Sequence, residues 1–140
     1  MGEIAFFSEG VDFDFNQSEE CTSWILNALG EEQRILDNIS VIFVSDNHLL
    51  NINQTYLKHD YLTDVITFDY SEAESISGDI FISVDRVKEN AGSFGQSFEH
   101  ELLRVIIHGV LHLCGYKDKT EEEIDIIRGK EDYYLSLRSF

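Results

Sequence analysis

The chain has 140 residues, of which 43% are hydrophobic and 12% aromatic, and it carries a formal net charge of −17. This length and composition favour one globular domain, residues 1–140, and the sequence contains no membrane span, which needs roughly 18 consecutive apolar residues. The negative charge argues against DNA as a partner and requires a local basic patch for any contact with RNA, while only two cysteines and no signal-peptide pattern favour the cytoplasm.

The hydrophobic periodicity predicts an alternation of strands and helices. In chain order we expect a strand at 3–7, a helix at 18–29, a strand at 38–45, a helix at 46–57 and a strand at 64–68. An acidic loop precedes a strand at 78–84, and helices follow at 85–91, at 98–113 and from Thr120 to the end of the chain. The mixture predicts a single α+β or α/β domain with a three- to four-stranded sheet, and it leaves the strand order open.

Several residues at the expected helix ends are of the types that cap helices. Ser18, Asp46 and Ser97 are expected N-caps, and Gly30 is an expected terminator of the first helix. Thr120 is followed three residues later by a glutamate, which is the spacing of a capping box.

The helix at 98–113 carries His108 and His112, whose four-residue spacing places both imidazoles on one face. Zinc hydrolases hold their metal with this spacing, although an isolated pair is more often two buried, hydrogen-bonded histidines. Gly115 and Asp118 follow His108 by 7 and 10 residues, offsets that some metalloproteases use for a turn-forming glycine and a third ligand. The pattern therefore predicts a zinc site made by His108, His112 and Asp118, with a solvated Asp118 as the alternative.

One residue of the peptidase pattern is absent. Metalloproteases with an H-E-x-x-H helix place a glutamate directly after the first histidine, where it serves as the general base. Gly109 occupies that position here, and the sequence shows no other general base. Peptide hydrolysis is therefore disfavoured.

The run H-G-V-L-H-L-C-G-Y at 108–116 resembles the signature H-G-x-L-H-L-x-G-Y-D-H of the YbeY family of bacterial endoribonucleases. Two upstream segments, LNINQTYLKHDYLTDVITF and GDIFIS, are similar to further family segments in the same order, so the resemblance covers about residues 38–135. It implies a zincin-like α+β fold with the histidine helix packed on the sheet, and one zinc ion per chain. It also implies cleavage of single-stranded RNA in 16S rRNA 3′-end maturation and ribosome quality control.

The chain departs from the family pattern in three places. Asp118 stands where the family has its third metal-binding histidine, with Lys117 in place of an aspartate. Leu57 stands where the family has an arginine, although Lys58 is adjacent, and Leu62 replaces a proline. The first change alters the charge balance of the metal, and the second removes a cation expected to contact RNA. A His-His-carboxylate set with an open fourth position is nevertheless a known catalytic arrangement for zinc.

A polar stripe surrounds the expected site, because His100, Arg104, His108 and His112 recur every four residues on an apolar helix. We expect this stripe to line a cleft, since unpaired buried polar groups are costly. Arg104 is a candidate to bind an RNA phosphate, with a salt bridge as an equally favoured alternative. Lys58 is the other candidate for contacts with the RNA backbone.

The roles of other residues near the motif are predicted less specifically. Asp64 and Asp79 are candidates to orient a ligand histidine, although capping a turn is slightly favoured. His100 is expected at the surface, and Cys114 is expected to point away from the metal.

Together the histidine pattern and the resemblance, which implies the activity on RNA, predict a cytoplasmic zinc-dependent endoribonuclease in which Arg104, His108 and His112 are catalytic. Its expected partners are ribosomal RNA, the small ribosomal subunit and a basic ribosomal protein. Whether a metal-activated water or the RNA's own 2′-hydroxyl attacks stays open. Two alternatives also stay open: a metal-dependent hydrolase of another substrate, and a non-catalytic ribosome-assembly factor with a structural or decayed metal site.

Overall fold

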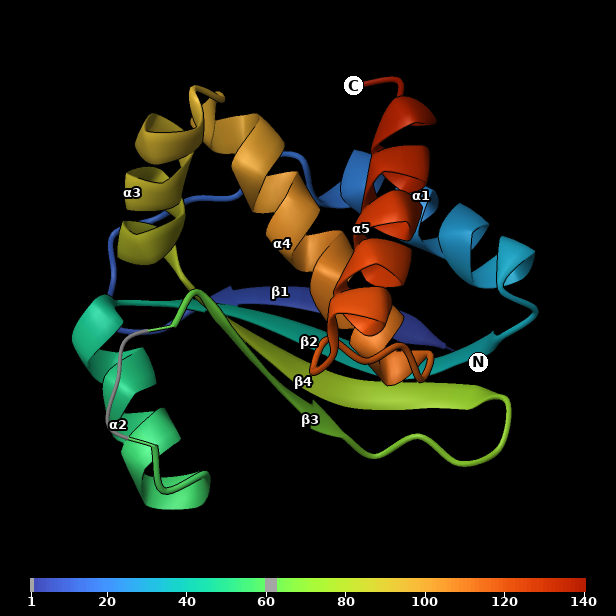
Figure 1. The fold of residues 1–140 in the computed structure, drawn as a ribbon, viewed down its shortest axis with the longest axis horizontal. Coiled ribbons are helices and arrows are strands. Elements are labelled where there is room, and N and C mark those ends of the chain that lie inside the picture. Colours follow the sequence, from blue (N-terminus) through green and yellow to red (C-terminus); the bar gives the residue numbers. More distant parts are fainter. Residues whose placement is uncertain (1, 60–62) are drawn as a thin grey trace.

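A computed structural model describes residues 2–59 and 63–140 of the chain. The elements, in order, are β1 (Glu3–Ser8), α1 (Ser18–Glu31), β2 (Ile35–Val44), α2 (Asp46–Tyr56), β3 (Val65–Asp69), β4 (Ser75–Ser83), α3 (Val84–Phe94), α4 (Phe98–Leu113) and α5 (Glu121–Ser136). Figure 1 shows α1, α3, α4 and α5 on one face of the sheet and α2 on the other. None of the helices in the described ranges has the length and apolar character needed to span a bilayer.

The strands form one mixed sheet in the order β1-β2-β4-β3. Strands β1, β2 and β4 are parallel, and β3 is an antiparallel edge strand paired with β4. The parallel pairing of β1 with β2 needs a crossover, which α1 supplies, whereas a short acidic loop joins β3 to β4. The predicted α+β class with three to four strands is confirmed, and the strand order places β4 in the interior of the sheet, where α4 packs on it.

The main core lies between the sheet and the helices of the upper face. Leu103, Ile106 and Ile107 of α4 are fully buried there, each contributing on the order of 1.5–3 kcal/mol relative to an exposed position. A Cβ atom on Gly109 would lie 2.7 Å from Cγ2 of Ile80 on β4, so this glycine lets α4 approach the sheet closely. A smaller cluster on the other face joins α2 to the sheet through Ile42, Val44, Leu49, Ile52 and Ile66.

Two of the predicted helix starts are confirmed in detail. The hydroxyl of Ser97 accepts a hydrogen bond from the backbone N–H of His100 at 3.1 Å, and α4 spans the predicted residues 98–113. The capping box of Thr120 and Glu123 is present at the start of α5.

The expected caps of the first two helices are wrong. Gln17, not Ser18, is the N-cap of α1, and Gly30 lies within that helix because a single glycine weakens a helix without ending it. Ser45 caps α2, whereas Asp46 is the first residue of that helix and forms an ion pair with Arg86 at 3.0 Å.

The sheet also extends beyond its predicted boundaries. Strands β2 and β4 each begin three residues earlier than predicted, at Ile35 and Ser75, and these two residues face each other in the ladder. The mutual pairing of two distant segments therefore sets where both strands begin.

Candidate metal centre

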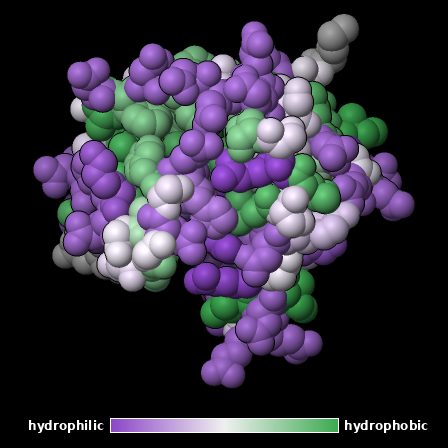
Figure 2. All heavy atoms as spheres, turned by 90° about the horizontal axis from the view of Figure 1, so that it is seen from above, coloured by the Kyte–Doolittle hydropathy of each residue, from purple (hydrophilic) through white to green (hydrophobic). Residues whose placement is uncertain are grey.

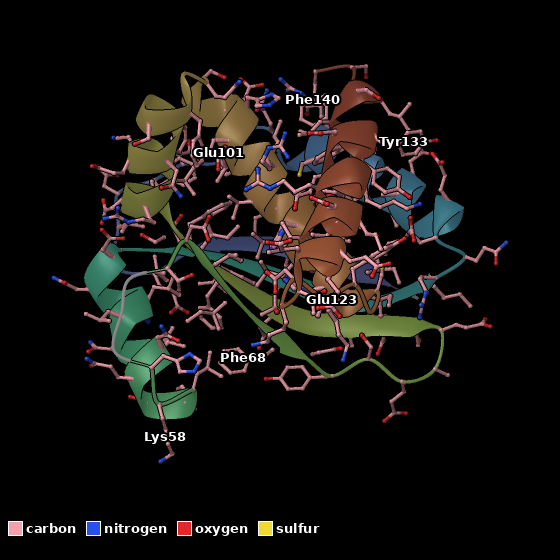
Figure 3. All side chains as sticks on the ribbon, in the orientation of Figure 1. Lys58, Phe68, Glu101, Glu123, Tyr133 and Phe140 are labelled. Atoms are coloured by element: carbon pink, nitrogen blue, oxygen red, sulfur yellow. The ribbon has the colours of Figure 1, made fainter. Side chains whose placement is uncertain are left out.

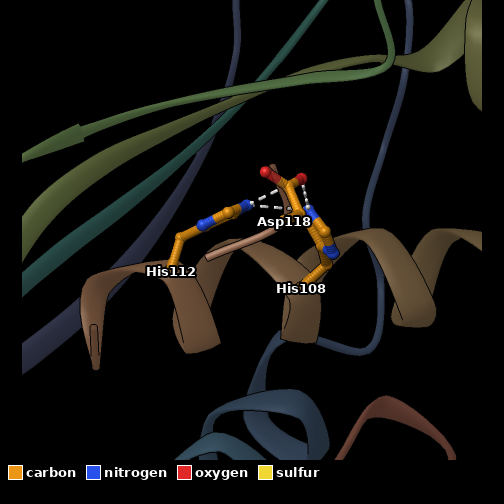
Figure 4. Close-up of side chains that lie close together, drawn as sticks. All are labelled: His108, His112 and Asp118. Carbon is orange, nitrogen blue, oxygen red and sulfur yellow. Dashed lines mark hydrogen bonds and ion pairs between the residues drawn. The ribbon is translucent and has the colours of Figure 1, made fainter. Parts of the chain in front are cut away.

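The chain reverses direction at the end of α4 through a Schellman turn. The backbone N–H of Gly115 donates to the carbonyl of His112 at 3.0 Å, and that of Tyr116 donates to the carbonyl of Leu111 at 3.1 Å. Gly115 has φ +105°, which L side chains rarely adopt. The turn brings Asp118 back beside the two histidines of the helix, as its spacing from Gly115 predicts (Figure 4).

Three ligand-type atoms converge at this point. The Nε2 atoms of His108 and His112 lie 3.0 Å apart, and Oδ2 of Asp118 lies 3.4 Å from the first and 3.2 Å from the second. Nitrogen and oxygen ligands of a tetrahedral zinc ion, bound at about 2.0–2.1 Å, are separated from one another by about 3.3 Å. The three atoms therefore fit three corners of a zinc tetrahedron.

The hydrogen bonds of the two imidazoles fix where their protons lie. Nδ1 of His112 donates to the carbonyl oxygen of Tyr116 at 2.9 Å, and Nδ1 of His108 donates to Oε2 of Glu131 at 2.6 Å. Neutral imidazoles that donate from Nδ1 carry lone pairs on Nε2. In these neutral forms two lone pairs and the carboxylate of Asp118 face one another, an arrangement that a metal cation satisfies.

Glu131 of α5 is the residue that orients His108, and it is only 3% exposed. Its Oε1 accepts from Nη1 of Arg104 at 2.8 Å, and Nη2 of Arg104 donates to Asp132 at 2.5 Å. Burial acts to lower the pKa of His108, but the hydrogen bond and charge of Glu131, together with Asp118, outweigh burial and raise it. The salt-bridge alternative for Arg104 is therefore observed.

Gly109, directly after His108, points at the sheet and not at the metal centre. A side chain here would collide with Ile80, so the glutamate of the peptidase pattern has no room in this fold.

Two hollows flank the metal centre. The first has a volume of about 570 Å³ and lies among β3, α3, α4 and α5. The second, of about 330 Å³, lies between β3, the end of α2 and the loop after α4. Asp64, His108 and Asp118 line both hollows, so the centre stands where the two meet.

The two cations expected to contact RNA, Arg104 and Lys58, lie in different places. Arg104 lines the first hollow. Lys58 lines neither hollow and projects from the end of α2 into solvent, whereas its neighbours Leu57 and His59 line the second (Figure 3). Leu62, the third departure from the family pattern, lies outside the described residues.

Two cations near the centre were not anticipated from the sequence. Lys119 lines the second hollow, and the exposed Arg128 of α5 lines the first. Neither side chain makes a hydrogen bond or ion pair with another residue in the ranges 2–59 and 63–140. Their position is a long-range property: Arg128 is separated from His108 by 20 residues and reaches the hollow through the packing of α5 on α4.

The remaining candidates have clear locations. Asp64 lies beside the centre and accepts a hydrogen bond from Asn90 at 3.4 Å, and burial raises its pKa. Asp79 lies within β4 and, as the neighbour of core residue Ile80, on the opposite face of the sheet from α4, so it cannot orient either histidine.

Two further expectations concern α4 and the residue after it. Cys114 is buried in the core, as expected, and burial raises its pKa to about 11. His100 is partly exposed and lines the first hollow, where α3 and α5 pack beside this end of α4.

The chain is similar to a group of known proteins. The family model for endoribonuclease YbeY matches residues 3–138. Proteins named endoribonuclease YbeY from Christiangramia forsetii and Flavobacterium psychrophilum are 48% and 49% identical over 97% and 94% of this chain, and each match covers 94% of the relative. A Thermotoga maritima protein of known solution structure has 32% identity and a TM-score of 0.68, over 96% of this chain and 87% of that one.

Proposed function

The chain belongs to the endoribonuclease YbeY family, and from that premise we propose that it is a zinc-dependent endoribonuclease specific for single-stranded RNA. Its proposed role is the maturation of the 16S rRNA 3′ end and the quality control of ribosomes in the cytoplasm. The observation that carries the proposal is the convergence of His108, His112 and Asp118 at the junction of two hollows.

The residues at the centre suit a catalytic zinc ion. His108, His112 and Asp118 would hold one ion per chain and leave a fourth position open. A bound zinc ion supplies a Lewis acid that polarises a phosphodiester oxygen and lowers the pKa of water. Glu131 and the carbonyl of Tyr116 orient the two imidazoles through their Nδ1 atoms, so the ligand atoms are positioned before the ion binds.

The hollows on either side of the centre would accommodate a polymer that enters on one side and leaves on the other. Arg128 and Lys119 are proposed to bind backbone phosphates, because neither is neutralised by a carboxylate of the described chain. Arg104 is proposed to act mainly by holding Glu131, although its guanidinium lines the same hollow. Lys58 would contact only RNA that extends beyond the hollows.

The high negative charge limits how such a protein binds its substrate. A charge of −17 repels RNA, so affinity should be weak, steeply dependent on salt, and concentrated at the few cations beside the centre. The acidic surface also suits a basic ribosomal protein, which would bring the enzyme to the small ribosomal subunit. Seen from above the helices, the surface is largely hydrophilic with scattered apolar patches (Figure 2).

A non-catalytic ribosome-assembly factor is the second candidate function, and the aspartate in place of a third histidine favours it. The two candidates differ in what the histidines do. An endoribonuclease needs them for RNA cleavage, whereas an assembly factor would bind the small ribosomal subunit without them.

The deciding experiment incubates the wild-type protein and a His108→Ala/His112→Ala variant with single-stranded RNA, double-stranded RNA and casein. We expect the wild type alone to cleave, and to cleave only single-stranded RNA. Cleavage of casein would favour a peptidase. Absence of cleavage by the wild type, with equal binding of both proteins to small subunits, would favour the assembly factor.

A further inference from the structure

The first hollow contains a buried carboxylate without a partner. Glu101 lies in the first turn of α4, is 3% exposed and lines the hollow from the side of α3 (Figure 3). Its carboxylate makes no hydrogen bond or ion pair with any residue in the described ranges. Glu131 is equally buried, but both of its oxygens are used, by Arg104 and His108. Among the described residues, the one buried side-chain polar atom without a partner is Nε of Arg86, so the Glu101 oxygens open onto the hollow, where a ligand can supply donors.

The buried end of this hollow is acidic, whereas the exposed Arg128 lines it on the solvent side. Asp64, Glu101, Glu131 and Asp118 all line it, and Arg104 is already held by two carboxylates. Burial raises the pKa of both Asp64 and Glu101, but Asp64 accepts a hydrogen bond from Asn90, whereas Glu101 accepts none from a described side chain. The inner part of the hollow therefore suits an uncharged group that carries N–H donors.

Part of the remaining wall is apolar and suits a flat ring; it is formed by Val65, Phe94, Val105, Ile124 and Ile127. The polar side chains of Asn90, Gln96, His100 and Arg128 also line the hollow. Its volume, about 570 Å³, is within the usual range for small-molecule sites. RNA-binding proteins recognise unpaired bases in this way, by packing against the ring and hydrogen bonding to its Watson–Crick edge.

The distance along α4 also fits one nucleotide. Glu101 precedes His108 by seven residues, which is two helical turns or about 10.5 Å. This is close to the reach of a nucleotide from its phosphate to the outer edge of its base. A phosphodiester at the metal centre would thus place the adjacent base near Glu101.

We propose that the first hollow is a base-recognition pocket in which the Glu101 carboxylate accepts hydrogen bonds from N1–H and N2–H of a guanine adjacent to the cleaved phosphodiester. Guanine is favoured because its Watson–Crick edge presents two neighbouring donors, which match the two oxygens of one carboxylate. Adenine and cytosine each present an acceptor beside a donor, which an ionised carboxylate does not match. This inference rests on the proposed function, since it concerns which base the enzyme selects.

The first test measures binding without cleavage. Guanosine, inosine and adenosine 5′-monophosphates are titrated into the wild-type protein, and binding is followed by NMR. We expect inosine monophosphate, which lacks the N2 amino group, to bind roughly tenfold or more weakly than guanosine monophosphate, because one charge-assisted hydrogen bond is lost. Equal affinities for all three nucleotides would overturn the proposal. This comparison needs no variant and so does not depend on how a variant folds.

The second test uses Glu101→Gln, which keeps the shape of the side chain but replaces one acceptor by a donor. We expect it to lose the preference for guanosine monophosphate and, in single-stranded RNAs that differ at one base, the preference for cleavage next to guanine. Glu99→Gln is the matched control, because Glu99 lies in the same turn of α4 but is bound to Arg138 and does not line the hollow.

The inference and the proposed function can fail separately. RNA cleavage that is independent of base, and unchanged in Glu101→Gln, would overturn the pocket and leave the endoribonuclease in place. Guanine-selective binding that Glu101→Gln abolishes, in a protein that cleaves no RNA, would support the pocket and overturn the proposed function.

Discussion

Glu131 and His108 lie on different helices, yet Oε2 of Glu131 accepts a hydrogen bond from Nδ1 of His108 at 2.6 Å. The contact crosses the interface between α5 and α4, so the orientation of a metal-binding imidazole depends on how the last helix packs. Arg104 holds the other carboxylate oxygen of Glu131, which fixes the carboxylate in place. The metal centre is thus supported by a buried polar network and not by its three ligands alone.

The first prediction tests this support. Glu131→Gln removes the charge that favours the Nδ1–H tautomer of His108, and zinc affinity should fall by roughly 10–100-fold. Affinity is measured by competition with a chromophoric chelator. Asp132→Asn is the control, because Asp132 is exposed and binds only the other end of Arg104. If Glu131→Gln binds zinc as tightly as the wild type, the network does not orient the ligand.

The second prediction concerns the ligands. His108→Ala and His112→Ala should each abolish the binding of one zinc ion per chain, whereas His48→Ala, on α2, should retain it. Elemental analysis of the purified proteins gives the metal content, and circular dichroism checks the fold. Full metal content in both variants at the centre would place the ion elsewhere.

The third prediction concerns the aspartate at which this chain departs from its family's signature. Asp118→Ala should weaken zinc binding, but less than loss of either histidine, because water can occupy the vacated position. Asp118→His should bind zinc more tightly than the wild type, since it restores the three-histidine set. Unchanged affinity in Asp118→Ala would show that this carboxylate is not a ligand.

The fourth prediction compares two helical glycines. Gly109→Ala places a methyl group against Ile80 and should lower the free energy of unfolding by about 1–3 kcal/mol. Gly129→Ala, in α5, meets no neighbouring atom within 4 Å and should raise it by about 0.5–1 kcal/mol. Urea unfolding measures both. Changes of the same sign would mean that α4 does not lie as close to β4 as described.

The fifth prediction concerns pH. The carboxylate of Glu32 accepts hydrogen bonds from the hydroxyls of Tyr116, at 2.8 Å, and Tyr134, and it pairs with Lys130 at 3.3 Å. Burial acts to raise the pKa of Glu32, but these donors outweigh burial and lower it. A lowered pKa stabilises the folded state above the ordinary value of 4.5, and this stabilisation is lost as the pH falls through the lower folded-state value.

The difference in unfolding free energy between the wild type and Glu32→Gln should therefore be constant near neutral pH and shrink below about pH 4. Urea unfolding at a series of pH values measures it. A difference that does not change with pH would show that the Glu32 carboxylate is not held in its charged form by these donors.

The features that could be predicted from the sequence are those encoded locally. Helical spacing places His108 and His112 on one face, and the need for a positive φ at Gly115 implies the turn that returns Asp118. Glu131 could not be placed in this way, because it lies 23 residues beyond His108. The sequence feature that could have identified Glu131 as buried is its helical spacing from Ile127 and Tyr134, which are both buried.

Long-range packing also accounts for the other misjudged residues. Asp79 lies on the face away from α4 because it alternates with the core residue Ile80 along β4, and which face α4 covers is set by tertiary packing. The partners of Arg104 and the absence of described partners for Glu101 likewise depend on how α3 and α5 pack beside α4.

Whether one metal ion at His108, His112 and Asp118 makes this protein an endoribonuclease is tested by a zinc titration. The protein is stripped of metal with a chelator, dialysed, and supplied with increasing zinc while the cleavage rate of a single-stranded RNA is measured. We expect no cleavage without metal, a linear rise in rate as zinc is added, and a plateau at one zinc ion per chain, with no recovery in His108→Ala. Cleavage that persists in the metal-free protein, or that zinc restores equally in His108→Ala, would contradict it.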